Sequence, residues 1–438
     1  MKDFYALIGI LLCFNANSQI DTLLLAHEHY TLPNGLQVVL QPEESVKEVS
    51  VEFWLLDGTA IDEPHQYGLQ HFFEHIMPYS PMDSDKRDKF FDDYLKGSNA
   101  QVKKDFSRFY LKVIPEGLEL ALERTSGRLK AGPDRISEKR VESERTRVLA
   151  EIKRNAKNPH WSAPGSLAIY EGTFGVGHPY AANGYGQLEN NKRFTLNDLR
   201  QRYRDIVYAN NVVLFIVGNF DLVKTKALIL GYFGDLEAKR KTYTSPVLIK
   251  QSTEQVSAKA PHPQDSLNTL VLSWAISEWK MRDDAALRLI SAHLNNSFGK
   301  EELTLTPSVQ RSGAYSDMYA NAGQFYIRIQ FSDSKDSTQI EQFLLDKIKQ
   351  LTDRKLEVLE LQKALASEIN DIKDMQNQLG FQWSRTELLG KNLLFHGKPN
   401  AYFKRVKLQQ RMSARKIKKA AQTWLKNDPF RILFTARK

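Results

Sequence analysis

Cysteine is almost absent from this chain of 438 residues, which contains only Cys13. Beyond that position the chain can form no disulfide bond and offers no thiolate to a metal ion. Structural zinc sites are usually closed by four protein ligands, and cysteine is common among them. The composition therefore argues against a binding module built around a structural zinc ion.

Long hydrophobic runs are also scarce. The apolar stretch from Phe4 to Phe14 is too short for a membrane-spanning helix, which needs about 20 residues. Lys2 precedes this stretch, and the small residues Ala16 and Ser18 follow it. This order is typical of a secretory signal peptide, here residues 1–18, cleaved after Ser18. We therefore expect an exported protein, most simply a periplasmic one, without stable membrane insertion after cleavage.

Two alternatives for the N-terminus stay open. Residues 4–14 could remain uncleaved as a membrane anchor. A lipid anchor on Cys13 is the other alternative, but a lipidated cysteine normally follows a small residue and Leu12 precedes this one.

The basic excess is spread along the chain in short clusters, such as Lys239-Arg240-Lys241 and Arg415–Lys419. The 61 basic and 52 acidic residues give a net charge of +9, and no basic block alternates with aromatic residues. This distribution predicts no nucleic-acid partner. The hydrophobic content of 42% is sufficient for a sizeable core, in two or more domains.

The most informative motif is His71-Phe72-Phe73-Glu74-His75. Positions i and i+4 of a helix lie one turn apart on one face, so both imidazoles can reach one metal ion. Glu74 would lie beside that ion, where it could take a proton from water. The order H-x-x-E-H is that of the inverzincin peptidases. The alternative is an amphipathic helix with two surface histidines.

A catalytic zinc ion takes three protein ligands, so the motif predicts a third ligand elsewhere. Residues 137–158 read as one long helix with Ser137 as its N-cap. Glu144 and Glu151 are seven residues apart and share one face with Val148. Burying a carboxylate on the apolar face of a helix costs free energy unless the carboxylate is paired or binds a metal ion. The alternative is a charged helix exposed to solvent.

These features and several others together resemble the insulinase/pitrilysin family of zinc metallopeptidases. The resemblance covers nearly the whole chain after the first two dozen residues. It rests on Gly68-Leu69 with the histidine motif, on Glu151 76 positions after His75, and on the segments Gly58–Pro64, Asn99-Ala100, Pro115–Leu122, Gly177–Tyr180 and Asn210–Asp221.

The resemblance implies a zinc-dependent endopeptidase. His71, His75 and Glu151 would bind Zn²⁺, with Glu74 as the general base and Glu144 supporting the site. Asn99 and Ala100 would begin an edge strand that pairs with the peptide backbone of the substrate. Substrates would then be extended or unfolded peptides.

The resemblance also implies an α+β fold of two homologous α/β-sandwich-like halves, each a mixed or antiparallel sheet packed on helices, facing each other like a clamshell. The sequence itself carries a repeat that fits this duplication. Thr195 and Leu199, followed by residues 213–216, align at an offset of 218 with Ser413, Ile417 and residues 431–434.

The predicted domains follow from this duplication. They are a zinc-bearing domain at residues 19–237, a linker at 238–265 and a homologous domain without zinc ligands at 266–438. Within the first domain, the glycine-rich stretch from Trp161 to Phe194 predicts a loop with short helical turns.

One part of the family pattern is missing. Active members carry an Arg and, seven residues later, a Tyr in the second half, to stabilise the transition state. Here Tyr315 matches the Tyr, but Ser308 stands in place of the Arg. Arg311 lies close by in another register and stays open as a substitute for the Arg. This departure predicts the zinc-bearing subunit of a two-chain peptidase, whose partner supplies the Arg/Tyr pair, or a homodimer. The competing interpretation is a non-catalytic family member that acts as a structural or assembly subunit.

Overall fold

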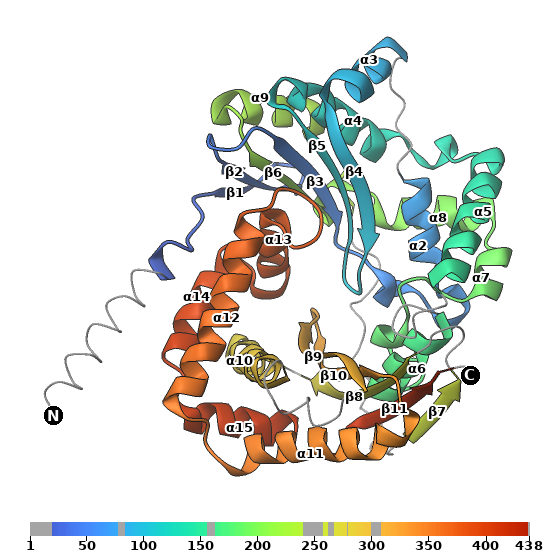
Figure 1. The fold of residues 1–438 in the computed structure, drawn as a ribbon. Coiled ribbons are helices and arrows are strands. Elements are labelled where there is room, and N and C mark those ends of the chain that lie inside the picture. Colours follow the sequence, from blue (N-terminus) through green and yellow to red (C-terminus); the bar gives the residue numbers. More distant parts are fainter. Residues whose placement is uncertain are drawn as a thin grey trace, which may run out of the picture.

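The structure, a computed structural model, describes residues 20–77, 84–155, 163–239, 257–261, 267–277, 279–298 and 308–436. The predicted signal peptide lies outside these residues. Two mixed sheets, each packed on helices, make up the two halves of the molecule (Figure 1), so the expected α+β fold is confirmed.

Sheet A belongs to the first half and has the strand order β1-β2-β6-β3-β5-β4. Only β2 and β6 run parallel, and β4 is an edge strand. Its strands are β1 (Glu28–Thr31), β2 (Gln37–Pro42), β3 (Val49–Leu55), β4 (Leu95–Val102), β5 (Ser107–Val113) and β6 (Val212–Gly218).

Sheet B belongs to the second half and has the order β7-β11-β8-β10-β9. Only β7 and β11 run parallel, so the order and directions repeat those of β2-β6-β3-β5-β4. Its strands are β7 (Ser257–Pro261), β8 (Asn268–Ser277), β9 (Val309–Met318), β10 (Ala322–Phe331) and β11 (Phe430–Thr435). The repeated segments of the sequence become the helix–strand units α8–β6 and α15–β11.

The helices of the first half are α2 (Leu69–Ile76), α3 (Ser84–Lys89), α4 (Leu118–Lys130), α5 (Glu138–Asn155), α6 (Ala163–Phe174), α7 (Leu188–Arg193), α8 (Leu196–Ile206) and α9 (Leu222–Phe233). Those of the second half are α10 (Met281–Phe298), α11 (Ser337–Asp353), α12 (Val358–Gln376), α13 (Arg385–His396), α14 (Ala401–Gln410) and α15 (Ala414–Trp424). The element that corresponds to α2, between β8 and β9, is α10.

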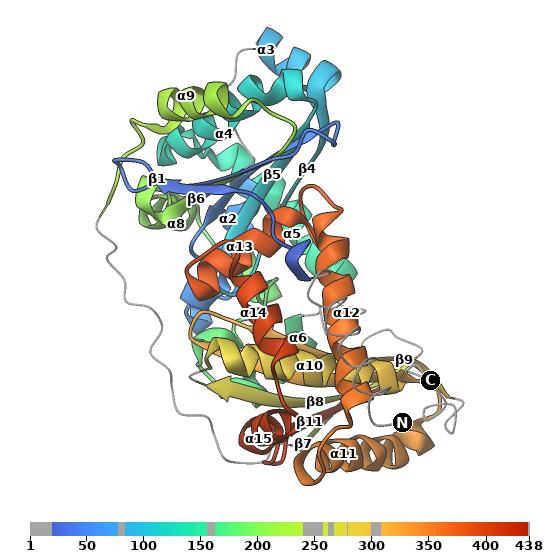
Figure 2. The ribbon, with the colours of Figure 1, turned by 90° about the vertical axis from the view of Figure 1, so that its left-hand side faces the viewer.

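The central strands of each sheet are buried on both faces, and elements of the other half pack on one face of each sheet. Helices α12 to α14 lie on the side of sheet A that faces the second half (Figure 2). Their apolar side chains, among them Leu389 and Tyr402, pack on Trp54 and Phe215 of this sheet. In return, Ile169 of α6 packs on sheet B. Strands buried on both faces form nearly continuous apolar runs, as the sequence of β6 does. The two halves therefore share hydrophobic cores.

Helix α6 corrects one expectation from the sequence. The stretch from Trp161 to Phe194 was predicted to be a loop with short helical turns, but it contains this helix of 12 residues. Glycine weakens an isolated helix. Here the apolar side of α6 packs on sheet B, and Gly172 permits the close approach to Phe430.

The predicted domain boundaries remain predictions. Strand β7 lies inside the predicted linker, residues 238–265, and pairs with β11. Most of the remaining linker lies outside the described residues. Within the described part of the chain, no helix combines the length and the apolar character needed to cross a membrane.

The packing of α6 on sheet B yields a testable prediction about stability. A Cβ at Gly172 would lie 2.1 Å from the ring of the buried Phe430, so Gly172→Ala should reduce the free energy of unfolding by about 1–3 kcal/mol. The control is Gly231→Ala in α9, where a Cβ meets no atom within 4 Å. That change should be neutral or stabilise by up to about 1 kcal/mol. Urea denaturation measures both, and equal effects would contradict the close packing.

Candidate metal and peptide site

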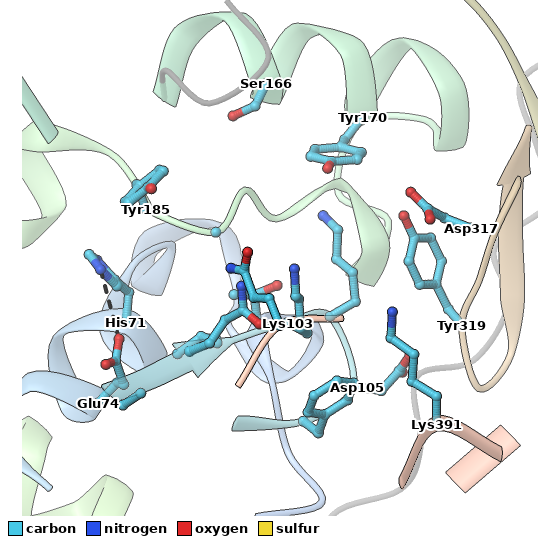
Figure 3. A pocket seen from close by; sticks show the side chains of 18 of the residues that line it. His71, Glu74, Lys103, Asp105, Ser166, Tyr170, Tyr185, Asp317, Tyr319 and Lys391 are labelled. Atoms are coloured by element: carbon cyan, nitrogen blue, oxygen red, sulfur yellow. Dashed lines mark ion pairs between the residues drawn. The ribbon is translucent and has the colours of Figure 1, made fainter. Parts of the chain in front are cut away.

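A cavity of about 550 Å³ lies between the two halves. Residues from α2, β4, α5 and α6 line it on one side, and residues from β9, β10 and α13 line it on the other. Figure 3 shows His71 and Glu74 at one end of the cavity and Asp317, Tyr319 and Lys391 at the other. The sequence motif therefore faces a cavity that residues of both halves line.

Asp62 holds the N-terminus of α2. Its Oδ2 accepts hydrogen bonds from the N–H groups of Gly68 and Gln70, both at 3.2 Å. Arg202 of α8 donates to its Oδ1 at 2.8 Å, and both charged groups are buried. A carboxylate at a helix N-terminus binds otherwise unpaired N–H groups and opposes the positive end of the helix dipole. The helix start is fixed in this way.

Two arginines hold the C-terminus of α2. Arg128 of α4 donates from Nε to the carbonyl oxygen of Met77 at 3.2 Å. Arg140 of α5 donates from Nη2 to the carbonyl oxygen of His75 at 3.3 Å. Cations at this end match the negative end of the dipole. The helix that carries the motif is thus bound at both ends by side chains from α4, α5 and the segment before it.

Three side chains that suit a metal ion converge next to the cavity. Oε2 of Glu151 lies 3.3 Å from Nε2 of His75 and 3.8 Å from Nε2 of His71. His71, Glu74 and His75 also bring ligand-type atoms within 4.8 Å of one another. Glu151 is the better third ligand because it approaches both Nε2 atoms, whereas Glu74 Oε2 is 4.0 Å from His71 Nε2. Two imidazoles and one carboxylate are a ligand set of catalytic zinc sites, so the donors fit this ion.

Glu144 lies behind His75. Its Oε2 is 3.5 Å from Nδ1 of His75, and its Oε1 is 3.4 Å from Nη2 of Arg140. Arg147 also approaches Oε1, at 3.0 Å, from the solvent side. A carboxylate on the second nitrogen of a ligand histidine orients the ring and fixes its tautomer. This arrangement directs Nε2 of His75 towards Glu151.

The site favours a neutral His71 and a basic Glu74. Burial lowers the pKa of His71 to about 4, so its imidazole is neutral and can bind a metal. Burial raises the pKa of Glu74 to about 7, opposed by the positive charges of His75 and Arg128. Burial therefore makes Glu74 a stronger base than a carboxylate in water.

Strand β4 presents its edge to the cavity. Asn99 and Ala100 line the cavity together with Gln101 and Val102. The N–H of Ala100 donates to Oδ1 of Asn99 at 2.8 Å. An edge strand can bind an extended peptide through its main chain.

The second-half residues of the sequence prediction do not line the cavity that contains His71. The hydroxyl of Ser308 pairs with the carboxylate of Asp336, and Arg311 is exposed on β9. Tyr315 stacks on Tyr326 with ring centroids 4.9 Å apart and lines a second cavity of about 300 Å³. A catalytic role for Tyr315 or Arg311 stays a prediction.

Sequence reasoning assigned no role to Tyr185 and Lys104, both of which line the first cavity. The ring of Tyr185 meets that of His71 edge to face, with centroids 5.1 Å apart. The Nζ of Lys104 donates to two carbonyl oxygens in the loop before α7, and burial lowers its pKa to about 7. The flanking Gly184 and Gly186 are the one sequence signal for Tyr185.

Two family models match this chain. The model described as insulinase (peptidase family M16) matches residues 37–168, and that described as peptidase M16 inactive domain matches residues 193–368. The chain belongs to the insulinase family of peptidases, family M16. The resemblance recognised from the sequence is confirmed.

Named relatives agree with this assignment. The chain is 27% identical over 240 residues to the uncharacterized zinc protease YmxG of Bacillus subtilis, covering 52% of this chain and 57% of that protein. It is 24% identical over 292 residues to the zinc protease PqqE of Helicobacter pylori, covering 64% of each. The matches thus span less than two thirds of these relatives.

A solved structure resembles the fold as a whole. The crystal structure of a protease from Helicobacter pylori superposes with a TM-score of 0.80 at 17% identity, covering 95% of this chain and 100% of that one. The family contains zinc proteases and also domains described as inactive.

The contact between Glu144 and His75 can be tested through metal affinity. Glu144→Gln should weaken zinc binding about 10- to 100-fold because His75 loses its charged partner. Glu142→Gln, an exposed position on the same helix, is the control and should leave the affinity unchanged. Competition with a chromogenic chelator measures both variants. An equal loss of zinc affinity in both variants would show that the substitutions act on the helix as a whole and not through the contact between Glu144 and His75.

Proposed function

We propose that this protein is a zinc-dependent endopeptidase that hydrolyses extended or unfolded peptides. The observation that carries the proposal is the approach of Glu151 to Nε2 of both His71 and His75, with Glu74 beside them at the cavity. Membership of the insulinase family supports the same chemistry.

The proposed roles follow from these positions. His71, His75 and Glu151 hold the zinc ion, which supplies Lewis acidity to the scissile carbonyl group and to the attacking water. Glu74 accepts the proton of the water and passes it to the leaving amine. Glu144 keeps His75 in position. Asn99 and Ala100 of β4 align the peptide as an added strand.

The family relationship also raises the question of a partner chain. Because Ser308 replaces the Arg of the family pair, we propose that full activity requires a partner chain or a second copy that supplies an Arg and a Tyr. We also propose that the protein is exported to the periplasm and that residues 1–18 are its signal peptide.

A second candidate function is that of a structural subunit without catalysis. The match of residues 193–368 to a model described as an inactive domain favours it. The intact set of His71, Glu74, His75 and Glu151 argues against it. Zinc content separates the two, because a subunit without catalysis has no need of the ion.

The role of Glu74 is tested by substitution. Glu74→Gln should lower kcat for unfolded peptides by about 10²–10⁴-fold, with zinc content unchanged, because the general base is lost. Glu189→Gln, on the surface in α7, is the control and should retain the rate. Hydrolysis of a mixed peptide library, with metal analysis of the same samples, gives the answer. Zinc near one per chain with equal cleavage by wild type and Glu74→Gln would exclude this mechanism.

Strand addition on β4 predicts a periodic response to changes in the substrate backbone. Methylation of single backbone nitrogens should impair cleavage at alternate positions, because only every second N–H of a strand faces the same neighbour. The expected loss in kcat/KM at these positions is about tenfold, because the methyl group removes one hydrogen bond and clashes with the neighbouring strand. Kinetics on a series of N-methylated peptides measure this. A uniform loss, or none, would contradict strand addition.

A further inference from the structure

Hydrolysis of a peptide bond places negative charge on the carbonyl oxygen of the substrate. A hydrogen-bond donor fixed next to that oxygen stabilises the transition state. The side chains of Arg311 and Tyr315, which the sequence suggested for this task, do not line the cavity that contains His71 and Glu74. Among the residues that do line this cavity, Tyr185 brings its phenol ring into edge-to-face contact with the ring of His71.

Tyr185 and Glu74 both lie beside His71, one of the proposed zinc ligands. The ring of Tyr185 stands perpendicular to that of His71, at an interplanar angle of 89°. Figure 3 shows Tyr185 on one side of His71 and Glu74 on the other. A carbonyl group bound beside His71 would therefore have the proposed base on one side and a phenol on the other.

The backbone next to Tyr185 packs directly against the backbone at the start of α2. A Cβ at Gly186 would lie 2.1 Å from the Cα of Gly68, so only glycine allows this contact. Asn191 Nδ2 donates to the carbonyl oxygen of Tyr185 at 3.3 Å and to that of Gln187 at 2.9 Å. The side chain therefore starts from a backbone that is fixed relative to the motif helix, as a preorganised donor requires.

We propose that Tyr185 is a catalytic residue that donates a hydrogen bond to the oxyanion of the transition state. The inference rests on the proposed peptidase function and adds a donor from the zinc-bearing half itself. This donor gives the chain basal activity of its own although Ser308 replaces the Arg of the family pair.

The water oxygen bonds to the carbonyl carbon, its proton passes to Glu74, and the electron pair of the carbonyl double bond moves to oxygen. That oxygen accepts the hydrogen bond from Tyr185, which keeps its proton. The C–N bond then breaks, the C=O bond re-forms, and Glu74 returns the proton to the leaving amine.

The test uses the zinc-loaded full chain and the variant Tyr185→Phe, which removes only the hydroxyl. Single-turnover hydrolysis of an unfolded peptide gives the rate. Calorimetry gives the affinity for a phosphinic peptide, whose tetrahedral P–O group mimics the oxyanion. The affinity for an amide peptide of the same sequence is measured on the Glu74→Gln background. Tyr232→Phe on the surface helix α9 is the matched control.

We expect Tyr185→Phe to lower the rate of hydrolysis by about 10²–10³-fold and to lower the affinity for the phosphinic peptide by a comparable factor. Affinity for the amide peptide and zinc content should not change, and Tyr232→Phe should behave as wild type. The inference is overturned if Tyr185→Phe keeps its affinity for the phosphinic peptide. It is also overturned if Tyr170→Phe or Tyr315→Phe shows the loss instead.

These outcomes separate the inference from the proposed function. Cleavage that depends on Glu74 but not on the hydroxyl of Tyr185 would refute the inference alone. Absence of zinc, or cleavage that does not need Glu74, would refute the proposed function. The phosphinic peptide still decides the role of Tyr185 if the isolated chain turns over too slowly to measure.

Discussion

The candidate site depends on the placement of one short helix. Helix α2 has eight residues, and isolated helices shorter than about 12–15 residues are marginal in water. The carboxylate of Asp62 binds the N-terminal N–H groups of α2, and the guanidinium groups of Arg128 and Arg140 bind its last carbonyl groups. The signs of these charges oppose the helix dipole at each end. Both histidines and Glu74 take their positions from this arrangement.

Packing between the halves fixes the opposite wall of the cavity. Each sheet offers the other half an apolar face, covered by α12 to α14 in one case and by α6 in the other. A buried ion pair between Arg108 of β5 and Glu387 of α13, at 3.1 Å, adds a polar contact to the interface. Buried charges are tolerated when they are paired. The cavity is therefore bounded by two sets of elements that belong to shared hydrophobic cores.

Much of the fold and of the candidate site could be predicted from local patterns in the sequence. The spacing of His71 and His75 places both rings on one helical face, and the seven-residue spacing of Glu144 and Glu151 does the same on α5. The repeated helix–strand unit correctly indicated two halves of equal topology. These inferences succeeded because helical and strand periodicities are properties of neighbouring residues.

The sequence by itself determined which side chains share a face and which segments repeat, because the period of a helix or a strand follows from the backbone alone. Only the tertiary structure decided which faces meet. The glycine-rich stretch that contains α6 was predicted to be a loop, yet the contact with sheet B stabilises this helix. Likewise, the contact of Gly186 with Gly68 brings Tyr185 to His71 across more than a hundred positions. Such contacts depend on how distant surfaces fit, which no local pattern encodes.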